Sequence, residues 1–490
     1  MSLLKALDET KKEFFSKSSL HGFKYLLKYR HRTLFDRFFW FCLLVGALYG
    51  TVSLLLFSWN EFVEEPTVTI LENSEYPISL VPFPGISICD LNKINRRKVE
   101  AFAEELALRS NYSIEYVEEI VSLLGKLYDF GGGTLSDDLL FQSQSFMDEF
   151  AHITSEVVFD PYNTLKRLSP SCTELLSKCS WNGVVYNCTD LFVSEVTIEG
   201  FCCVFNYLPA RNSSRISKIL KVNKNKVLRM SNSDGLSVVV HHDVDDYFYP
   251  LLSSAGALID IFNARDFPDA TSGSLQQRLI AVGVEIFFEI TATVIYAVPE
   301  VKKYSISTRK CIFPEESKTL FGTRYSRSDC LLDCRIKSMM ALCQCVPFTY
   351  VGLLNGSRLP QCNLLDIPCL YKYQHKWRRL FPSDYKGDDM ETDKQDSLQC
   401  NHCTPSCSNV WYSASNYFTY LDKTRNGNKT NFSVVHVTFR NEYAERYKHD
   451  VVYYWYEIVS KQFGRRLQPN DGLKPDKRRR TCLFFYDQTI

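Results

Sequence analysis

A single uncharged run, Phe38 to Trp59, is the feature that most constrains how this chain of 490 residues can fold. Its 22 residues include no Lys, Arg, Asp or Glu. A helix of that length rises about 33 Å, roughly the hydrocarbon thickness of a bilayer. The run therefore predicts a transmembrane helix over residues 38–59.

The charges on either side of this run predict its orientation. The residues before it are basic, at Lys24, Lys28, Arg30, Arg32 and Arg37. The residues after it are acidic, at Glu61, Glu64 and Glu65. By the positive-inside rule, residues 1–37 face the cytosol and residues 60–460 lie outside the cell. A cleaved signal peptide is the competing interpretation, but its apolar core is usually only about 7–15 residues long.

Most of the 18 cysteines fall in the portion predicted to lie outside. Cys42 is in the apolar run and Cys482 is in the C-terminal segment, which leaves an even number, 16, for the region between. An even number in an oxidising compartment predicts disulfides. The predicted disulfide cysteines are Cys89, Cys172, Cys179, Cys188, Cys202, Cys203, Cys311, Cys330, Cys334, Cys343, Cys345, Cys362, Cys369, Cys400, Cys403 and Cys407.

Zinc is the alternative for some of these cysteines. Cys330-x3-Cys334 and Cys400-x2-Cys403 approach ligand spacing, and His402 is adjacent. An oxidising compartment favours disulfides, so we expect no metal. N-x-S/T sequons agree with the extracellular placement, because none precedes the apolar run. They begin at Asn111, Asn187, Asn212, Asn355, Asn428 and Asn431.

Hydrophobic periodicity predicts an α+β ectodomain with a β-strand core and peripheral helices. Residues 93–128 are predicted to be helical, with a second helix capped by Ser113 and ended by Gly131–Gly133. Residues 236–241, 282–298 and 433–439 have strand patterns. Around Cys330 the pattern is helical again, which places Cys330 and Cys334 one turn apart on one face.

Charge and motifs exclude several function classes. The net charge of +1 divides into +5 for residues 1–37, −9 for 38–460 and +5 for 461–490. An acidic ectodomain can raise the local cation concentration, and it gives no reason to expect nucleic-acid binding. The nine histidines are scattered and there is no G-x-S-x-G, so we expect neither a catalytic site nor a cofactor. Asp137-Asp138, His241-His242 and Asp388-Asp389 are interpreted as surface pairs.

An ordered set of motifs resembles the degenerin/epithelial sodium channel family, most of all an insect pickpocket subunit. It begins with His21-Gly22 before the apolar run, Phe83-Pro84-Gly85-Ile86-Ser87-Ile88-Cys89 after it, and Gly200-Phe201-Cys202-Cys203. It continues with Gly235-Leu236-Ser237-Val238, with Tyr325-Ser326-x3-Cys330-x3-Cys334-x8-Cys343-x-Cys345, and with Cys403-Thr404-Pro405-Ser406-Cys407. The resemblance covers residues 20 to about 460.

The resemblance implies a subunit of an amiloride-sensitive channel that carries sodium ions across the plasma membrane. It implies a homotrimer or a heterotrimer with related subunits, held in the lipid bilayer with its N-terminus in the cytosol. His21 and Gly22 would be the cytosolic gating motif. Cys330, Cys334, Cys343 and Cys345 would hold the helices of the thumb region.

The C-terminal segment departs from the family pattern. A second span with a Gly-x-Ser selectivity filter is expected after the ectodomain, yet Val451 to Ser460 is followed by Lys461, Arg465, Arg466 and the run Lys477 to Arg480. Ten residues rise only about 15 Å as a helix, and each charge in the bilayer costs roughly 2.5 to 3.5 kcal/mol. We therefore expect residues 461–490 to be a basic tail and this form to be modulatory. A different last exon or an incomplete gene model would produce the same join.

Two other functions fit parts of the sequence. A membrane-anchored glycosyltransferase has the same topology, and Asp243-Val244-Asp245 forms a D-x-D that could hold a divalent cation. A short acidic turn is the simpler interpretation of that motif. A single-pass adhesion or receptor ectodomain would explain the cysteines and sequons, but it would not explain the ordered motifs.

Overall fold

The computed structural model describes residues 34–109, 112–131, 135–153, 159–208, 235–319, 324–351, 359–382, 389–422 and 431–452, together with residues 10, 13, 385 and 387. The chain divides into two compact units, residues 1–68 with 451–490, and residues 69–450. The arrangement within each unit is as follows.

The first unit contains α2 (Leu34–Glu64), a helix of 31 residues. Its segment Phe38–Phe57 is long and apolar enough to cross a membrane, and it is the one such helix in the part of the chain described above. Its large side chains are exposed, as expected for a helix that faces lipid. Just beyond it, the N–H of Val452 donates to the carbonyl of Pro66 over 2.9 Å. The segment that leaves the helix and the last described segment of the chain, at Val452, therefore meet.

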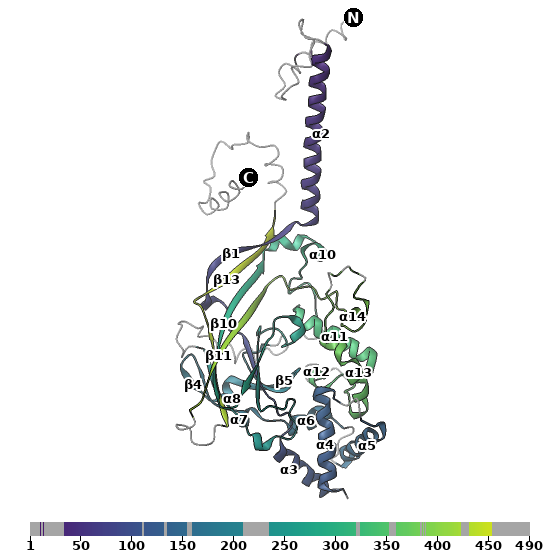
Figure 1. The fold of residues 1–490 in the computed structure, drawn as a ribbon, viewed down its shortest axis with the longest axis vertical. Coiled ribbons are helices and arrows are strands. Elements are labelled where there is room, and N and C mark those ends of the chain that lie inside the picture. Colours follow the sequence, from purple (N-terminus) through teal and green to yellow (C-terminus); the bar gives the residue numbers. More distant parts are fainter. Residues whose placement is uncertain are drawn as a thin grey trace. The chain divides into compact units, whose positions relative to one another are not determined.

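The second unit is built on two sheets (Figure 1). The larger has eight strands in the order β1-β13-β10-β12-β7-β3-β4, with β11 also paired to β10. Its strands are β1 (Thr67–Pro77), β3 (Leu176–Trp181), β4 (Val184–Tyr186), β7 (Leu236–His241), β10 (Val284–Ala297), β11 (Asn409–Tyr420), β12 (Phe432–Phe439) and β13 (Tyr443–Val451). The smaller has the order β5-β6-β2-β8-β9. Its strands are β2 (Gly85–Asp90), β5 (Phe192–Thr197), β6 (Gly200–Phe205), β8 (Gly256–Phe262) and β9 (Gln276–Ala281).

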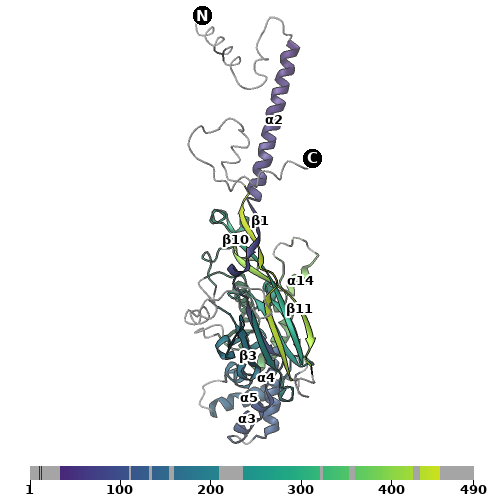
Figure 2. The same cartoon turned by 90° about the vertical axis from the view of Figure 1, so that its left-hand side faces the viewer.

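Strand β10 is paired along both edges. One edge runs antiparallel to β11 from Val284 to Ile295, and the two strands extend along the length of the unit in Figure 2. The other edge pairs in parallel with β12 over 285–290 and then with β13 over 293–297. The sequence alternates along β10, so that Ile286, Phe288 and Ile290 are buried while the residues between them are partly exposed.

The main core lies between the two sheets. Ile86, Ile88 and Ile259 from the smaller sheet share one apolar cluster with Phe288 and Val435 from the larger. Both faces contribute β-branched and aromatic side chains, as expected where two sheets bury their inner faces against each other.

The helices lie outside the sheets, which confirms the α+β class. Figure 1 shows α3, α4 and α5 at one end of the strands and α11 and α13 along one flank. The α-helices are α3 (Arg96–Ala107), α4 (Ile114–Asp129), α5 (Asp137–Ile153), α6 (Pro161–Leu168), α7 (Cys172–Leu175), α8 (Cys188–Leu191), α10 (Ile306–Arg309), α11 (Arg327–Cys343), α12 (Phe348–Val351), α13 (Ile367–Arg378) and α14 (Glu391–Gln395). The 3-10 turns are η2 (Ile78–Leu80), η3 (Val244–Asp246), η4 (Ala270–Ser272), η5 (Pro299–Lys303) and η6 (Leu364–Asp366).

Several local predictions are confirmed. Ser113 caps α4 by accepting from the N–H of Tyr116. The predicted strands correspond to β7, β10 and β12. Two details differ from the prediction. Helix α4 ends in a left-handed Phe130 (φ 56°), before the glycines. His242 is completely buried, so the prediction that His241-His242 is a surface pair is wrong for one of its members.

Gly256, which begins β8, provides a test of the sheet packing. Its φ is +147°, and an added Cβ would lie 2.1 Å from the carbonyl oxygen of Ile280 on β9. We expect Gly256→Ala to lower the free energy of unfolding by about 3 kcal/mol, because the backbone strain is combined with a clash. Gly273→Ala is the control, since Gly273 also has a positive φ but faces open space. It should cost about 1 kcal/mol. Thermal unfolding of the full-length chain measures both, and equal losses would contradict this packing.

Candidate functional site

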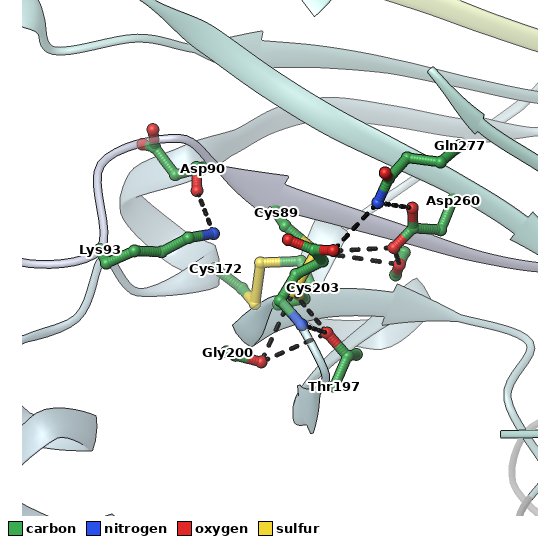
Figure 3. Close-up of a disulfide and its surroundings, with 12 residues drawn as sticks. Cys89, Asp90, Lys93, Cys172, Thr197, Gly200, Cys203, Asp260 and Gln277 are labelled. Atoms are coloured by element: carbon green, nitrogen blue, oxygen red, sulfur yellow. Dashed lines mark hydrogen bonds between the residues drawn. A yellow bond between two sulfur atoms is a disulfide. The ribbon is translucent and has the colours of Figure 1, made fainter. Parts of the chain in front are cut away.

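A group of buried charges surrounds one disulfide of the smaller sheet (Figure 3). Cys89, at the end of β2, is bonded to Cys202 on β6, and the neighbouring Cys203 is bonded to Cys172. Asp260 on β8 and Lys93 after β2 lie beside the Cys89–Cys202 bridge with almost no exposed surface. Buried charges are costly unless they are paired, so their partners determine what this cluster can do.

Both carboxylate oxygens of Asp260 accept hydrogen bonds from neighbouring side chains. The Ser87 hydroxyl donates to Oδ2 over 2.8 Å. The Gln277 side-chain amide donates to Oδ1 over 3.1 Å, and it also donates to Oε1 of Glu199 over 3.1 Å. Burial raises the pKa of Asp260 to about 6, and the nearby Glu199 carboxylate adds to the rise. Asp260 is therefore a carboxyl group that gains its proton in mildly acidic solution.

Lys93 is the basic member of the cluster. Its Nζ donates to the backbone carbonyl of Asp90 over 2.6 Å. Burial lowers the pKa of Lys93, although Glu199, Asp90 and Asp260 all favour the charged amine. Burial likewise raises the pKa of Asp90 to about 6. Three carboxyl groups thus favour the charge on one amine, and proton uptake by Asp260 near pH 6 removes its repulsion with Glu199.

Sequence reasoning missed this cluster. Asp90 follows Cys89 directly, Lys93 lies three residues beyond Asp90, and Asp260 interrupts the apolar strand β8. A charged residue inside an apolar strand was the signal available. A single sequence does not show that the three residues converge, because they meet only when β2 and β8 pair.

A second candidate region is the arm formed by α11 and α13. Disulfides join these two helices to each other and to the segment before β11. Cys330 and Cys334 on one face of α11 are bonded to Cys403 and Cys400. This pairing leaves no thiolate among those four for the zinc alternative. The remaining bridges of the ectodomain are Cys179–Cys188, Cys311–Cys407, Cys343–Cys369 and Cys345–Cys362.

A buried ion pair holds this arm to the η4 turn. The Arg335 guanidinium on α11 donates to Asp269 over 3.1 Å, to the Thr271 hydroxyl over 2.7 Å and to the Trp377 carbonyl over 3.1 Å. Removing one member of such a pair leaves an uncompensated charge, which typically costs about 3 to 5 kcal/mol. These residues line one side of a cavity of about 570 Å³ that also contacts Tyr128 at the end of α4.

The strands at the two ends of the ectodomain are joined by an arginine. Arg446 on β13 stacks over the rings of Tyr296 on β10 (4.2 Å) and Tyr76 on β1 (4.9 Å). Its Nε lies 3.3 Å from Oε2 of Glu72, and the Tyr296 hydroxyl donates to Oε1 of the same carboxylate. Cation–π contacts and ion pairs of this kind together resist separation of β1 from β13.

The other predicted residues lie either outside the part of the chain that the structure describes or on its surface. His21, Gly22, Asn111, Asn212, Asn355, Asn428 and residues 453–490 lie outside the described residues. Asn187 and Asn431 are exposed. Asp243 of the D-x-D motif is paired with Arg97, and the motif forms the short η3 turn. This geometry matches the simpler interpretation of that motif.

The pKa of Asp260 predicts how stability depends on pH. Because its pKa is raised in the folded state, folded Asp260 binds its proton at a higher pH than unfolded Asp260. The charged form of Asp260 therefore lowers the free energy of unfolding above pH 6. This stability is regained as the pH falls from 6 towards 4 and the carboxylate is protonated. When the pH is lowered from 7 to 5, the free energy of unfolding of the wild type should rise by about 1 to 1.5 kcal/mol relative to that of Asp260→Asn.

Thermal unfolding of both proteins across that pH range measures the difference. Asp137→Asn, which removes an exposed carboxylate at the start of α5, is the control and should follow the wild type. Parallel pH profiles for the wild type and Asp260→Asn would contradict the raised pKa.

Comparison with known proteins relates this architecture to a family. The sequence pattern described as "Amiloride-sensitive sodium channel" matches residues 14–464. Sodium channel protein Nach of Drosophila ananassae is 26% identical over 469 residues, which cover 94% of this chain and 83% of that protein. Nach of Drosophila melanogaster is 26% identical over 475 residues, covering 93% and 83%. Pickpocket protein 19 of Drosophila melanogaster is 23% identical over 423 residues, covering 84% and 78%. With the family pattern matched over nearly its whole length, the chain belongs to the amiloride-sensitive sodium channel family.

Proposed function

We propose that this chain is a subunit of a trimeric sodium channel of the plasma membrane, with residues 1–37 in the cytosol and the disulfide-bonded ectodomain outside. The family is one of ion channels, and the relatives named above are sodium channel and pickpocket proteins. The trimer could consist of copies of this chain or include related subunits. The family membership favours a channel over a glycosyltransferase or an adhesion receptor.

One structural observation supports the proposal most strongly. The chain leaves α2 at Glu64, and Val452, the last residue of the described ectodomain, is hydrogen-bonded to Pro66. Strand β1, which follows Pro66, and strand β13, which precedes Val452, are neighbours in the larger sheet. Because β1 and β13 continue along the chain into the segments that meet at Pro66 and Val452, a change in these strands can be passed along the chain towards α2, as a gated channel requires.

The arm of α11 and α13 is connected to the same strands. Arg309, which is buried, is paired with Glu316 and donates to the carbonyl of Cys311 over 2.8 Å. Cys330 on α11 is bonded to Cys403, and Cys407, two residues before β11, is bonded to Cys311. Since β11 pairs with β10 and β10 pairs with β13, movement of the disulfide-bonded arm can reach the strand that ends beside Pro66.

Sodium current tests the proposal. The full chain would be expressed in cells without a native sodium current, alone and together with Drosophila melanogaster Nach. We expect an amiloride-blocked current that is lost when sodium is replaced by a large cation, or a change in the current of the co-expressed protein. Surface labelling would confirm that the chain reaches the plasma membrane.

Variants of the proposed cytosolic gating motif make the test specific. His21→Ala and Gly22→Ala should reduce the current or the modulation several-fold at an unchanged surface amount. Ser19→Ala is the matched control in the same segment. A chain that reaches the surface and leaves every sodium current unchanged would refute the proposal.

A further inference from the structure

The larger sheet ends in an open edge at β4. Among the strands that the structure describes, β4 (Val184–Tyr186) pairs with β3 alone. The backbone N–H and C=O groups along its other edge therefore have no described strand beside them. An edge of this kind can pair with another chain, and proteins usually cover it or place charged residues or proline along it. β4 contains neither a charge nor a proline.

The side chains at this edge are apolar and exposed. Val184 is 54% exposed and Val185 is 78% exposed. The cross-strand neighbour of Val185 on β3 is the polar Ser180. Two adjacent exposed valines on an open edge favour association between chains, because β-branched residues pair well across strands. We therefore expect something to cover this edge.

The chain places a sequon directly beside the edge. Asn187 follows the last residue of β4 and begins Asn187-Cys188-Thr189. Its backbone is extended (φ −68°, ψ 132°), so the alternation of the strand continues through it. Tyr186 is half-buried and Cys188 is buried, as expected for inward positions, whereas Val185 and Asn187 are exposed. Asn187 therefore projects on the same side as Val185, about 7 Å further along the chain.

The hydrogen bond of the Asn187 side chain is compatible with a sugar. Its Oδ1 accepts from the backbone N–H of Thr189 over 3.4 Å and caps α8. N-glycosylation uses the other amide atom, Nδ2, so the cap is retained. In that transfer the bond between C1 of the sugar and a phosphate oxygen of a lipid-linked donor breaks, and C1 bonds to Nδ2. The amide gives up one proton and the lipid diphosphate leaves.

We infer that an N-linked glycan on Asn187 covers the open edge of β4 and keeps it from pairing with the same edge of another copy of the chain. The oligosaccharide is bulky and hydrated, and its attachment two residues from Val185 holds it beside the edge at a high effective concentration. The glycan takes the part that a lysine or a proline takes on other edge strands. This inference rests on the proposed extracellular placement of the ectodomain, where sequons can be glycosylated.

Removal of the sequon tests the inference. Thr189→Ala abolishes the acceptor and leaves Asn187 in place as the cap, and Thr189→Ser, which keeps an N-x-S sequon, is the matched control. Full-length chain from a eukaryotic cell line would be purified in detergent and measured by size-exclusion chromatography with light scattering at several protein concentrations. For Thr189→Ala we expect several-fold more protein in species larger than the wild-type assembly, increasing with concentration. Thr189→Ser should match the wild type.

A second variant separates association through β4 from a general loss of folding. Val185→Lys places a charge on the open edge at a position that is 78% exposed, so the fold should tolerate it. Combined with Thr189→Ala, it should restore the size distribution of the wild type. Association that persists in the double variant would overturn the inference, because it would not involve this edge. An unchanged size distribution for Thr189→Ala alone would overturn it as well.

Mass spectrometry of the wild-type sequons separates failure of the inference from failure of the proposed placement. An unmodified Asn187 in a chain that is glycosylated at other sequons would overturn the inference and leave the extracellular placement intact. Absence of glycan from every sequon would contradict both.

Discussion

Backbone pairing along both edges of β10 is the constraint on which the rest of the ectodomain depends. One edge is occupied by β11 and the other by β12 and then β13. An interior strand loses most of its hydrogen bonds if it shifts register, and a shift of one residue would turn Ile286 and Phe288 out of the core. The outward face is also connected. His436 on β12 stacks on Phe287 (4.6 Å), bonds Glu285 through Nε2 (2.9 Å) and contacts the Ser237 hydroxyl on β7 (2.8 Å).

The parts proposed to act in gating are attached to this strand. The Cys330–Cys403 bridge joins α11 of the helical arm to the segment that leads into β11, and Arg446 joins β13 to β1. The Cys343–Cys369 bridge joins α11 to α13 covalently, so the two helices of the arm are suited to move together. The charges around Cys89–Cys202 differ in character, because their carboxyl groups change protonation within an accessible pH range.

Local patterns in the sequence predicted local structure well. The heptad-like spacing around Val117 and Ile120, the cap at Ser113 and the alternation in β10 and β12 each depend on neighbours within a few residues. The resemblance in ordered motifs predicted the family. What the sequence could not predict depends on non-local pairing. The disulfide partners, the successive alignment of β12 and β13 on one edge of β10, and the burial of Lys93, Asp260 and His242 all require the folded arrangement.

Hydrogen–deuterium exchange of the full-length chain measures most directly whether β10 organises the ectodomain. Backbone amides in β10 between 284 and 295 should exchange most slowly, because neighbours bond both edges. Those of β4, at the free edge of the same sheet, should exchange much faster. Slow exchange should be shared by β10, β12 and β13. Exchange in β10 as fast as in β4 would contradict it.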